Sequence, residues 1–262
     1  MKPDPDTLGA PVPIRLGAWH GARDERTAAK LVEAAVSGRE EHGAQTLKRD
    51  HRSLVVAVTT TEYALVIKEV RKAGARRRLA DVVRGSPARR AWTAGRRLIA
   101  SGIGAALPLA YLEQRALGTP VQSLLVSLDL REVPTATDHL RRPEQRETTL
   151  AALADLALAL HRSGVIHGDL RAEHVHIDTR PRLIDLESVR FRTRLSDDQR
   201  IEDLAQLNAS IADELASGRE RRTAFDRYAS ALPFDADAAD VRAQVERRSV
   251  ARGHLYRGGI TC

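Results

Sequence analysis

One segment in the second half of the chain constrains the fold more than any other, because it places several polar side chains between a helix and two short strands. Residues 160–191 read LHRSGVIHGDLRAEHVHIDTRPRLIDLESVRF. The helical spacing before this segment ends at Gly164, and the apolar runs that follow are too short for helices. Asp169 and His174 lie five positions apart on one loop, and Asp185 follows Asp169 by sixteen positions. This spacing allows the three side chains to converge on one phosphate site.

The segment resembles the catalytic loop and the metal-binding loop of kinases, and it is most similar to the bacterial lipopolysaccharide core kinases of the Kdo/WaaP type. The resemblance covers about residues 43–228, with VIKE at 66–69, ARRAWTAGRRLIASGIGAALPLAYLEQR at 88–115 and EDLAQLNAS at 202–210. It implies an α+β, two-lobed protein-kinase-like fold, with an antiparallel sheet in a small N-lobe and a larger, mostly helical C-lobe. It also implies ATP-dependent transfer of the γ-phosphate to a sugar hydroxyl of a lipopolysaccharide core or Kdo-type glycolipid.

The hydrophobic periodicity predicts the elements of each lobe. We expect helices over 26–37 and 87–101, strands over 54–58, 63–70, 107–111 and 121–128, and helices in the last third of the chain around 150–160, 201–215, 225–228 and 241–245. The polar stretch 129–145 contains Pro134 and Pro143 and is the expected hinge. We therefore expect a lead-in and helix over 1–40, an N-lobe over 41–130 and a C-lobe over 131–262.

The resemblance assigns four residues to the site. Asp169 would orient the acceptor hydroxyl and accept its proton, and Lys68 would contact the α- and β-phosphates of ATP. Asp185 would bind Mg²⁺, because a hard cation prefers carboxylate oxygen. His174 stands where most protein kinases have a metal-binding Asn, and an imidazole ligand there would make Mn²⁺ a second candidate ion. Each residue also has a structural alternative: turn residues for the two aspartates, a solvent-facing strand lysine, and a packing histidine.

Three further polar residues are expected to support the loop rather than to react. His161 and His167 are expected to hold the loop by hydrogen bonds. Asp203 opens a helix and is expected to anchor the loop backbone, with a plain helix cap as the alternative.

The sequence departs from the kinase pattern in ways that bear on activity. Residues 48–53, expected to cover the phosphates, contain no glycine, and Ala91 stands where many relatives have a Glu that pairs with the strand lysine. A pseudokinase that binds nucleotide without turnover is therefore the alternative of a different class. Kinases of tRNA-linked or small-molecule acceptors, whose loops also contain HGD, are a third hypothesis.

The acceptor class and the control of the enzyme are also indicated by the loop. Gly168 replaces the Arg that pairs with a phosphorylated activation loop in many protein kinases, so we expect a constitutively assembled site. Asp203 follows Asp185 by only eighteen positions. This leaves little room for a peptide-docking platform, so a sugar is the expected acceptor.

Charge and cysteine usage bound the partners. The formal net charge is +7, and residues 68–97 hold eleven Lys and Arg but only two acidic residues. Such a basic region can attract nucleic acid, an anionic membrane surface or a phosphorylated substrate, and a solvated charged face is the structural alternative. Together with the resemblance to kinases of glycolipids, it leads us to expect peripheral contact with an anionic membrane rather than a nucleic-acid partner. Cys262 is the only cysteine, which excludes an internal disulfide and a Cys-based metal site and fits a reducing cytoplasm. No apolar run is long enough to span a bilayer.

Overall fold

The computed structural model describes residues 7–39, 44–60, 63–71, 81 and 83–253. The chain divides into two compact units, unit 1 (Met1–Leu130) and unit 2 (Arg131–Cys262). The arginines at 76–78 of the basic stretch lie outside the described residues. Among the helices that are described, none is both long enough and apolar enough to cross a membrane.

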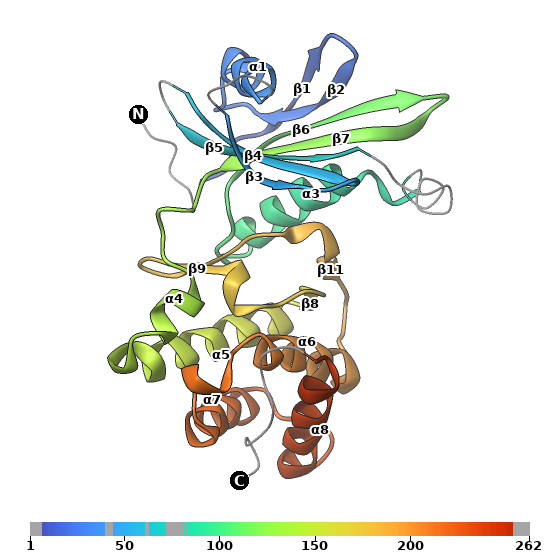
Figure 1. Cartoon of the computed structure of the whole chain (residues 1–262). Coiled ribbons are helices and arrows are strands. Elements are labelled where there is room, and N and C mark those ends of the chain that lie inside the picture. Colours follow the sequence, from blue (N-terminus) through green and yellow to red (C-terminus); the bar gives the residue numbers. More distant parts are fainter. Residues whose placement is uncertain (1–6, 40–43, 61–62, 72–80, 82, 254–262) are drawn as a thin grey trace. The chain divides into compact units, whose positions relative to one another are not determined.

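Unit 1 is built on a seven-stranded sheet in which all neighbouring strands run antiparallel (Figure 1). The strand order is β1-β2-β6-β7-β5-β4-β3. The strands are β1 (Pro11–Leu16), β2 (Trp19–Asp24), β3 (Gln45–Arg49), β4 (Ser53–Thr59), β5 (Ala64–Val70), β6 (Pro108–Ala116) and β7 (Thr119–Leu128), and the helices are α1 (Ala29–Gly38) and α3 (Pro87–Ala100). Alternation along the central strands buries one set of side chains fully, including Leu65, Ile67, Leu112, Leu124 and Val126.

Helix α3 starts and packs as its sequence predicts. Ser86 caps it by accepting a hydrogen bond from the backbone of Arg89, and Pro87 occupies the first turn. Its Trp92 ring packs against Tyr111 of β6, with ring centroids 5.1 Å apart. Tyr111 and Lys68 both pair with Leu125 of β7, and directly paired residues project from the same face of a sheet. Lys68 therefore projects from the face that α3 covers.

The first forty residues differ from the expected lead-in and helix. The helix is present as α1, but β1 and β2 precede it and extend the sheet beside β6. The sequence gives no clear strand pattern for β1, because this strand contains Pro11 and Pro13 and only its Ile14 is buried. Proline is tolerated there because β1 is an edge strand, where a missing N–H breaks no ladder on the open side.

Unit 2 is mostly helical and carries two short two-stranded sheets. Its helices are α4 (Ala136–Leu140), α5 (Arg146–Arg162), α6 (Asp197–Ala209), α7 (Gly218–Ala231) and α8 (Ala238–Ala251), and its strands are β8 (Val165–Ile166), β9 (Val175–Ile177), β10 (Pro181–Leu183) and β11 (Arg190–Phe191). Helix α6 ends before Ile211, earlier than the expected 201–215. Leucines of α5, among them Leu153 and Leu160, are buried in the core of this unit.

Candidate active site

The loop after β8 is held by the carboxylate of Asp203, which lies in α6 and is fully buried. Its two oxygens accept hydrogen bonds from the backbone amides of His167, at 2.7 Å, and Gly168, at 3.0 Å. Hydrogen bonds to an ionised acceptor are roughly twice as strong as neutral ones. The predicted anchoring of the loop by Asp203 is therefore present in the structure.

Two further residues of α6 and its C-terminal end continue this anchoring, and the sequence analysis missed both. Gln206 accepts from the amide of Leu170 at 3.1 Å and donates to the carbonyl of Gly168 at 3.3 Å. Ser210 accepts from the amide of Ala172 at 2.9 Å. The signal was available, since positions 203, 206 and 210 recur at the helical spacing that puts side chains on one face.

Gly168 has a backbone requirement of its own. Its φ is +76°, and a Cβ atom added there would lie 3.0 Å from the carbonyl oxygen of Ser188. Residues other than glycine adopt this conformation at a cost. Gly168 thus allows the turn that precedes Asp169. It also stands where many protein kinases regulated by phosphorylation have an arginine.

The two histidines beside this loop have different roles, and the expectation for one of them was wrong. His161 does make hydrogen bonds, with Nδ1 at 2.7 Å from the Tyr228 hydroxyl and Nε2 at 3.5 Å from Asp203. The ring of His167 is fully buried, and neither of its nitrogens has a hydrogen-bond partner among the described residues. Burial lowers the pKa of His167, although the nearby Asp203 acts in the opposite direction. The lowered pKa keeps the ring neutral. Only its backbone holds the loop.

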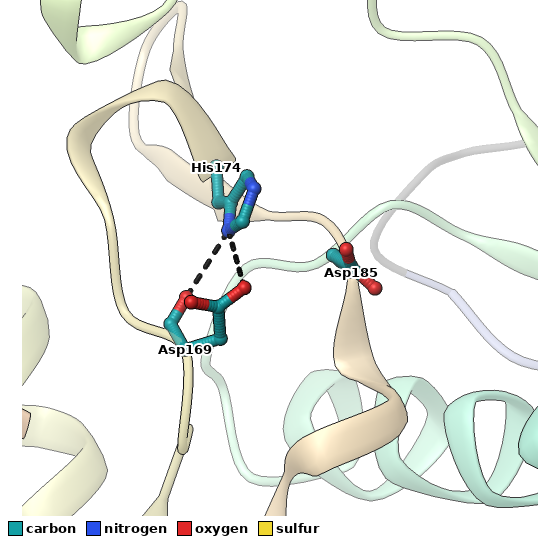
Figure 2. Close-up of side chains that lie close together, drawn as sticks. All are labelled: Asp169, His174 and Asp185. Carbon is teal, nitrogen blue, oxygen red and sulfur yellow. Dashed lines mark hydrogen bonds and ion pairs between the residues drawn. The ribbon is translucent and has the colours of Figure 1, made fainter. Parts of the chain in front are cut away.

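A strand pair brings the three candidate site residues together. The hairpin of β9 and β10 pairs Val175 with Leu183, and the amide of Ile184 donates to the carbonyl of His174 at 2.9 Å. Asp185 follows directly. Ligand atoms of Asp169, His174 and Asp185 consequently all lie within 4.8 Å of one another. Figure 2 shows the three side chains close together. Residues sixteen positions apart in the sequence thus form one cluster.

The orientation of His174 leaves one ring nitrogen available. Its Nδ1 lies 3.1 Å from the backbone carbonyl oxygen of Asp169 and 3.7 Å from the carboxylate of the same residue (Figure 2). A carbonyl oxygen can only accept a hydrogen bond, so Nδ1 carries the proton in the neutral ring. The lone pair then lies on Nε2, which is the usual arrangement of a metal-binding histidine held by a backbone carbonyl.

Asp185 has an unusual backbone that fits a site residue. Its φ is +58° and its ψ is +58°, in the left-handed region, and its side chain is exposed. Aspartate and asparagine adopt this conformation more readily than other L residues, although it still carries strain. Such backbone strain is concentrated at functional sites.

Lys68 belongs to unit 1, where its strand neighbour Glu69 is the better-defined residue. Glu69 is buried and forms ion pairs with Arg39, at 3.4 Å, and Arg71, at 2.7 Å. Glu69 therefore already has two cationic partners in unit 1. Ala91 of α3 is buried and supplies no carboxylate.

Comparison with known proteins gives a family match and a structure of similar fold. The model of the lipopolysaccharide kinase (Kdo/WaaP) family matches residues 52–228, more than half of the chain. A search of curated sequences finds no match. A solved structure described as WaaP in complex with acyl carrier protein is similar, with a TM-score of 0.62 and 21% sequence identity over 81% of this chain and 89% of that chain. This likeness confirms the predicted α+β, protein-kinase-like fold.

Proposed function

The chain belongs to the lipopolysaccharide kinase (Kdo/WaaP) family and is thus a phosphotransferase with an alcohol group as acceptor, and we propose that it transfers the γ-phosphate of ATP to a sugar hydroxyl of a lipopolysaccharide core glycolipid. One observation carries the proposal further than family membership does. It is the convergence of Asp169 and His174, which follow β8 on the loop that α6 holds, with Asp185, which follows β10; their ligand atoms lie within 4.8 Å of one another.

Asp169 is the proposed base. Its side chain is about half exposed, so an acceptor hydroxyl can reach it, while its backbone neighbours are fixed. A carboxylate placed beside a hydroxyl orients it and accepts its proton as the phosphate is transferred. Positioning of this kind is the main protein contribution to phosphoryl transfer.

Asp185 and His174 are the proposed ligands of a divalent cation. A carboxylate together with an imidazole Nε2 lone pair suits Mg²⁺ or Mn²⁺, with the nitrogen favouring Mn²⁺. The bound cation would neutralise phosphate charge. The backbone contact between His174 and Asp169 holds the imidazole in the required tautomer.

Lys68 is the proposed contact to the α- and β-phosphates. It lies within β5 and is only partly exposed, and its neighbours on the same face of the strand, Val66 and Val70, are apolar. A cation held by a rigid strand stabilises phosphate charge more than a mobile surface lysine does, because it needs little reorganisation when the phosphate binds.

The space after Asp185 supports a sugar as the acceptor. Between Asp185 and the start of α6 at Asp197, the chain forms only a 3-10 turn at Leu186–Ser188, the short strand β11 and connecting residues. Protein kinases carry their peptide-binding segment in this interval. The short interval here leaves little room for such a segment, which favours a sugar.

Because the proposed acceptor is a glycolipid, we further propose that the protein acts in the cytoplasm at the inner membrane surface, drawn there by the basic stretch at 68–97.

One observation favours a second candidate, a nucleotide-binding pseudokinase. In the turn between β3 and β4, the carboxylate of Asp50 accepts from the amides of Arg52 and Ser53, both at 2.7 Å. These hydrogen bonds hold the pKa of Asp50 at about 2. In kinases the corresponding amides contact phosphate. Here they are already occupied, in a turn without glycine.

The test combines cells and purified protein. Core glycolipids from cells with and without the gene are compared by mass spectrometry, and the kinase proposal expects one additional phosphate when the gene is present. Purified protein is then given labelled ATP and glycolipid from the deletion strain, with Asp169→Asn as the control. Nucleotide binding without transfer to this acceptor, together with identical glycolipids from both strains, would favour the pseudokinase.

A further inference from the structure

A second polar site lies in unit 1, where β1, β2, β6 and the first turn of α3 meet. It is an open depression of about 650 Å³, and we call it the basic cup. Its polar lining consists of Arg15, His20, Arg89, Tyr111, Glu113 and Arg115. None of these residues belongs to the cluster in unit 2.

The sheet register gathers these residues in a row. Arg15 pairs with His20 across β1 and β2, and His20 pairs with Glu113 across β2 and β6. Directly paired residues share a face, so all three side chains project together. Tyr111 and Arg115 lie two positions to either side of Glu113 on the same strand and therefore join that face.

A glycine makes this row possible. A Cβ atom added to Gly21 would lie only 1.9 Å from the backbone carbonyl oxygen of Tyr111. Strand β2 approaches β6 at this point more closely than a side chain permits. Gly21 lines the cup and brings Arg15 and His20 against β6.

The floor of the cup is neutralised and rigid. Glu113 is buried and accepts two hydrogen bonds from the guanidinium of Arg115, at 2.7 and 2.9 Å, and one from the amide of Ser86, at 3.4 Å. Burial opposes ionisation, yet the hydrogen bonds from Ser86 and Arg115 hold the pKa of Glu113 below its usual value. The charge of Arg115 is thus offset inside the structure.

Two other cations of the cup are not offset. Arg15 and Arg89 are exposed, and within the described part of the chain no carboxylate lies within ion-pair distance of either guanidinium. Each guanidinium presents up to five donors in a planar fork that matches phosphate oxygens. Two such forks and His20 facing one open volume form a site for a multiply charged anion.

We propose that the basic cup binds the phosphate monoester group of a ligand, with Arg15 and Arg89 as its principal contacts. A monoester is doubly charged near neutral pH, which matches two uncompensated guanidinium groups, whereas one carboxylate would leave a cation unpaired. The volume exceeds that of a phosphate group alone. The rest of the ligand lies against the Tyr111 ring and the apolar wall formed by Pro13 and Ile14. A free phosphorylated metabolite and the headgroup of a lipid with a terminal phosphate, such as phosphatidic acid, share this chemistry.

The experiment uses the full chain and two probes that differ only in being free or membrane-bound. Glycerol 3-phosphate is titrated by calorimetry, with intrinsic tryptophan fluorescence as a second readout, because the Trp92 ring contacts Tyr111 and Trp19 directly precedes His20. Vesicles of phosphatidylcholine with phosphatidic acid are tested by co-sedimentation against phosphatidylcholine alone. The variant is Arg15→Gln with Arg89→Gln. Its control, Arg219→Gln with Arg247→Gln, removes the same charge at exposed positions of α7 and α8.

The cup variant should bind the productive probe at least about tenfold more weakly than wild type, since a charge-assisted hydrogen bond contributes about that factor or more. The control should bind as wild type does. Binding of glycerol 3-phosphate would identify a free metabolite site, and binding of phosphatidic acid vesicles alone would identify a lipid headgroup site. Equal weakening in both variants would reduce the effect to net charge and overturn the proposal. Binding of neither probe by wild type would also overturn it.

Discussion

Substituting Ser210 with alanine tests whether α6 controls catalysis through the loop that it holds. Ser210 is buried, and its hydroxyl accepts from the amide of Ala172 and donates to the carbonyl of Leu207, at 2.9 and 2.7 Å. Alanine leaves the packing nearly unchanged but leaves the buried amide of Ala172 without its acceptor. Such a loss costs about 1–3 kcal/mol. Against a total stability of about 5–15 kcal/mol the variant should still fold.

The expected consequences are a modest change in melting temperature and a larger change in rate. The melting temperature should fall by about 2–12 °C, since each kcal/mol corresponds to roughly 2–4 °C in a chain of this size. The loop segment carrying Asp169 loses one of its fixed points, and a displacement of about 1 Å at a reacting group can cost about a hundredfold. We therefore expect kcat to fall by about 10- to 100-fold, measured with labelled ATP at 25 °C.

Ser249→Ala provides a matched control. Ser249 lies in α8, is fully buried, and its hydroxyl bonds to the carbonyls of Ala205 and Val245 and to the amide group of Asn208. Its removal should lower the melting temperature similarly but leave kcat within about twofold of wild type, because it touches none of the loop amides. Full activity of Ser210→Ala, or an equal loss of activity in both variants, would refute the argument that α6 acts through the loop.

Substitutions at three other positions address the proposed site directly. Asp185→Asn and Asp185→Ala should both lose most transfer activity. Only the alanine variant should also have a free energy of unfolding about 1 kcal/mol lower in thermal or denaturant unfolding, because asparagine tolerates the positive φ. If Asp185→Ala instead melted at a higher temperature than Asp185→Asn, the positive φ of Asp185 would not be a source of backbone strain. His174→Asn should reduce the ratio of Mn²⁺- to Mg²⁺-supported initial rates, since an oxygen replaces the imidazole nitrogen. An unchanged ratio would make His174 structural. Lys68→Met should lower kcat/KM by about a hundredfold with little change in melting temperature, because a charge is removed from a half-exposed strand position. Full activity would exclude Lys68 from phosphate binding.

The sequence predicted the elements whose periodicity is strong and missed those that depend on tertiary pairing. Helix α3 and strands β4 and β5 follow clear apolar patterns, and the structure contains them near the expected bounds. Strand β1 carries two prolines and one buried side chain, so no local pattern reveals it. Its formation depends on pairing with β2 and, through Gly21, on the close approach of β2 to β6.

The cluster of Asp169, His174 and Asp185 was predictable from the sequence, but only part of its support, the anchoring by Asp203, was. The spacing of Asp169, His174 and Asp185 indicated one phosphate site, and the structure brings the three together. The spacing could not reveal that His167 has no ring partner among the described residues, because the position of each ring nitrogen depends on packing around the loop. The helical spacing of 203, 206 and 210 placed Gln206 and Ser210 on the same face as Asp203, but it did not identify which backbone amides of the loop they hold. Those contacts join positions more than thirty-five apart.

The row of α6 side chains has a consequence for how fast the loop amides exchange with deuterated water. Amides bonded to buried side-chain acceptors open only with the surrounding structure, so those of His167, Gly168 and Ala172 should exchange slowly without any nucleotide. In a kinase switched by phosphorylation, the activation segment gains order only after modification. A loop ordered in advance loses little further entropy when substrate arrives. We therefore expect the exchange of these amides to change little when nucleotide binds.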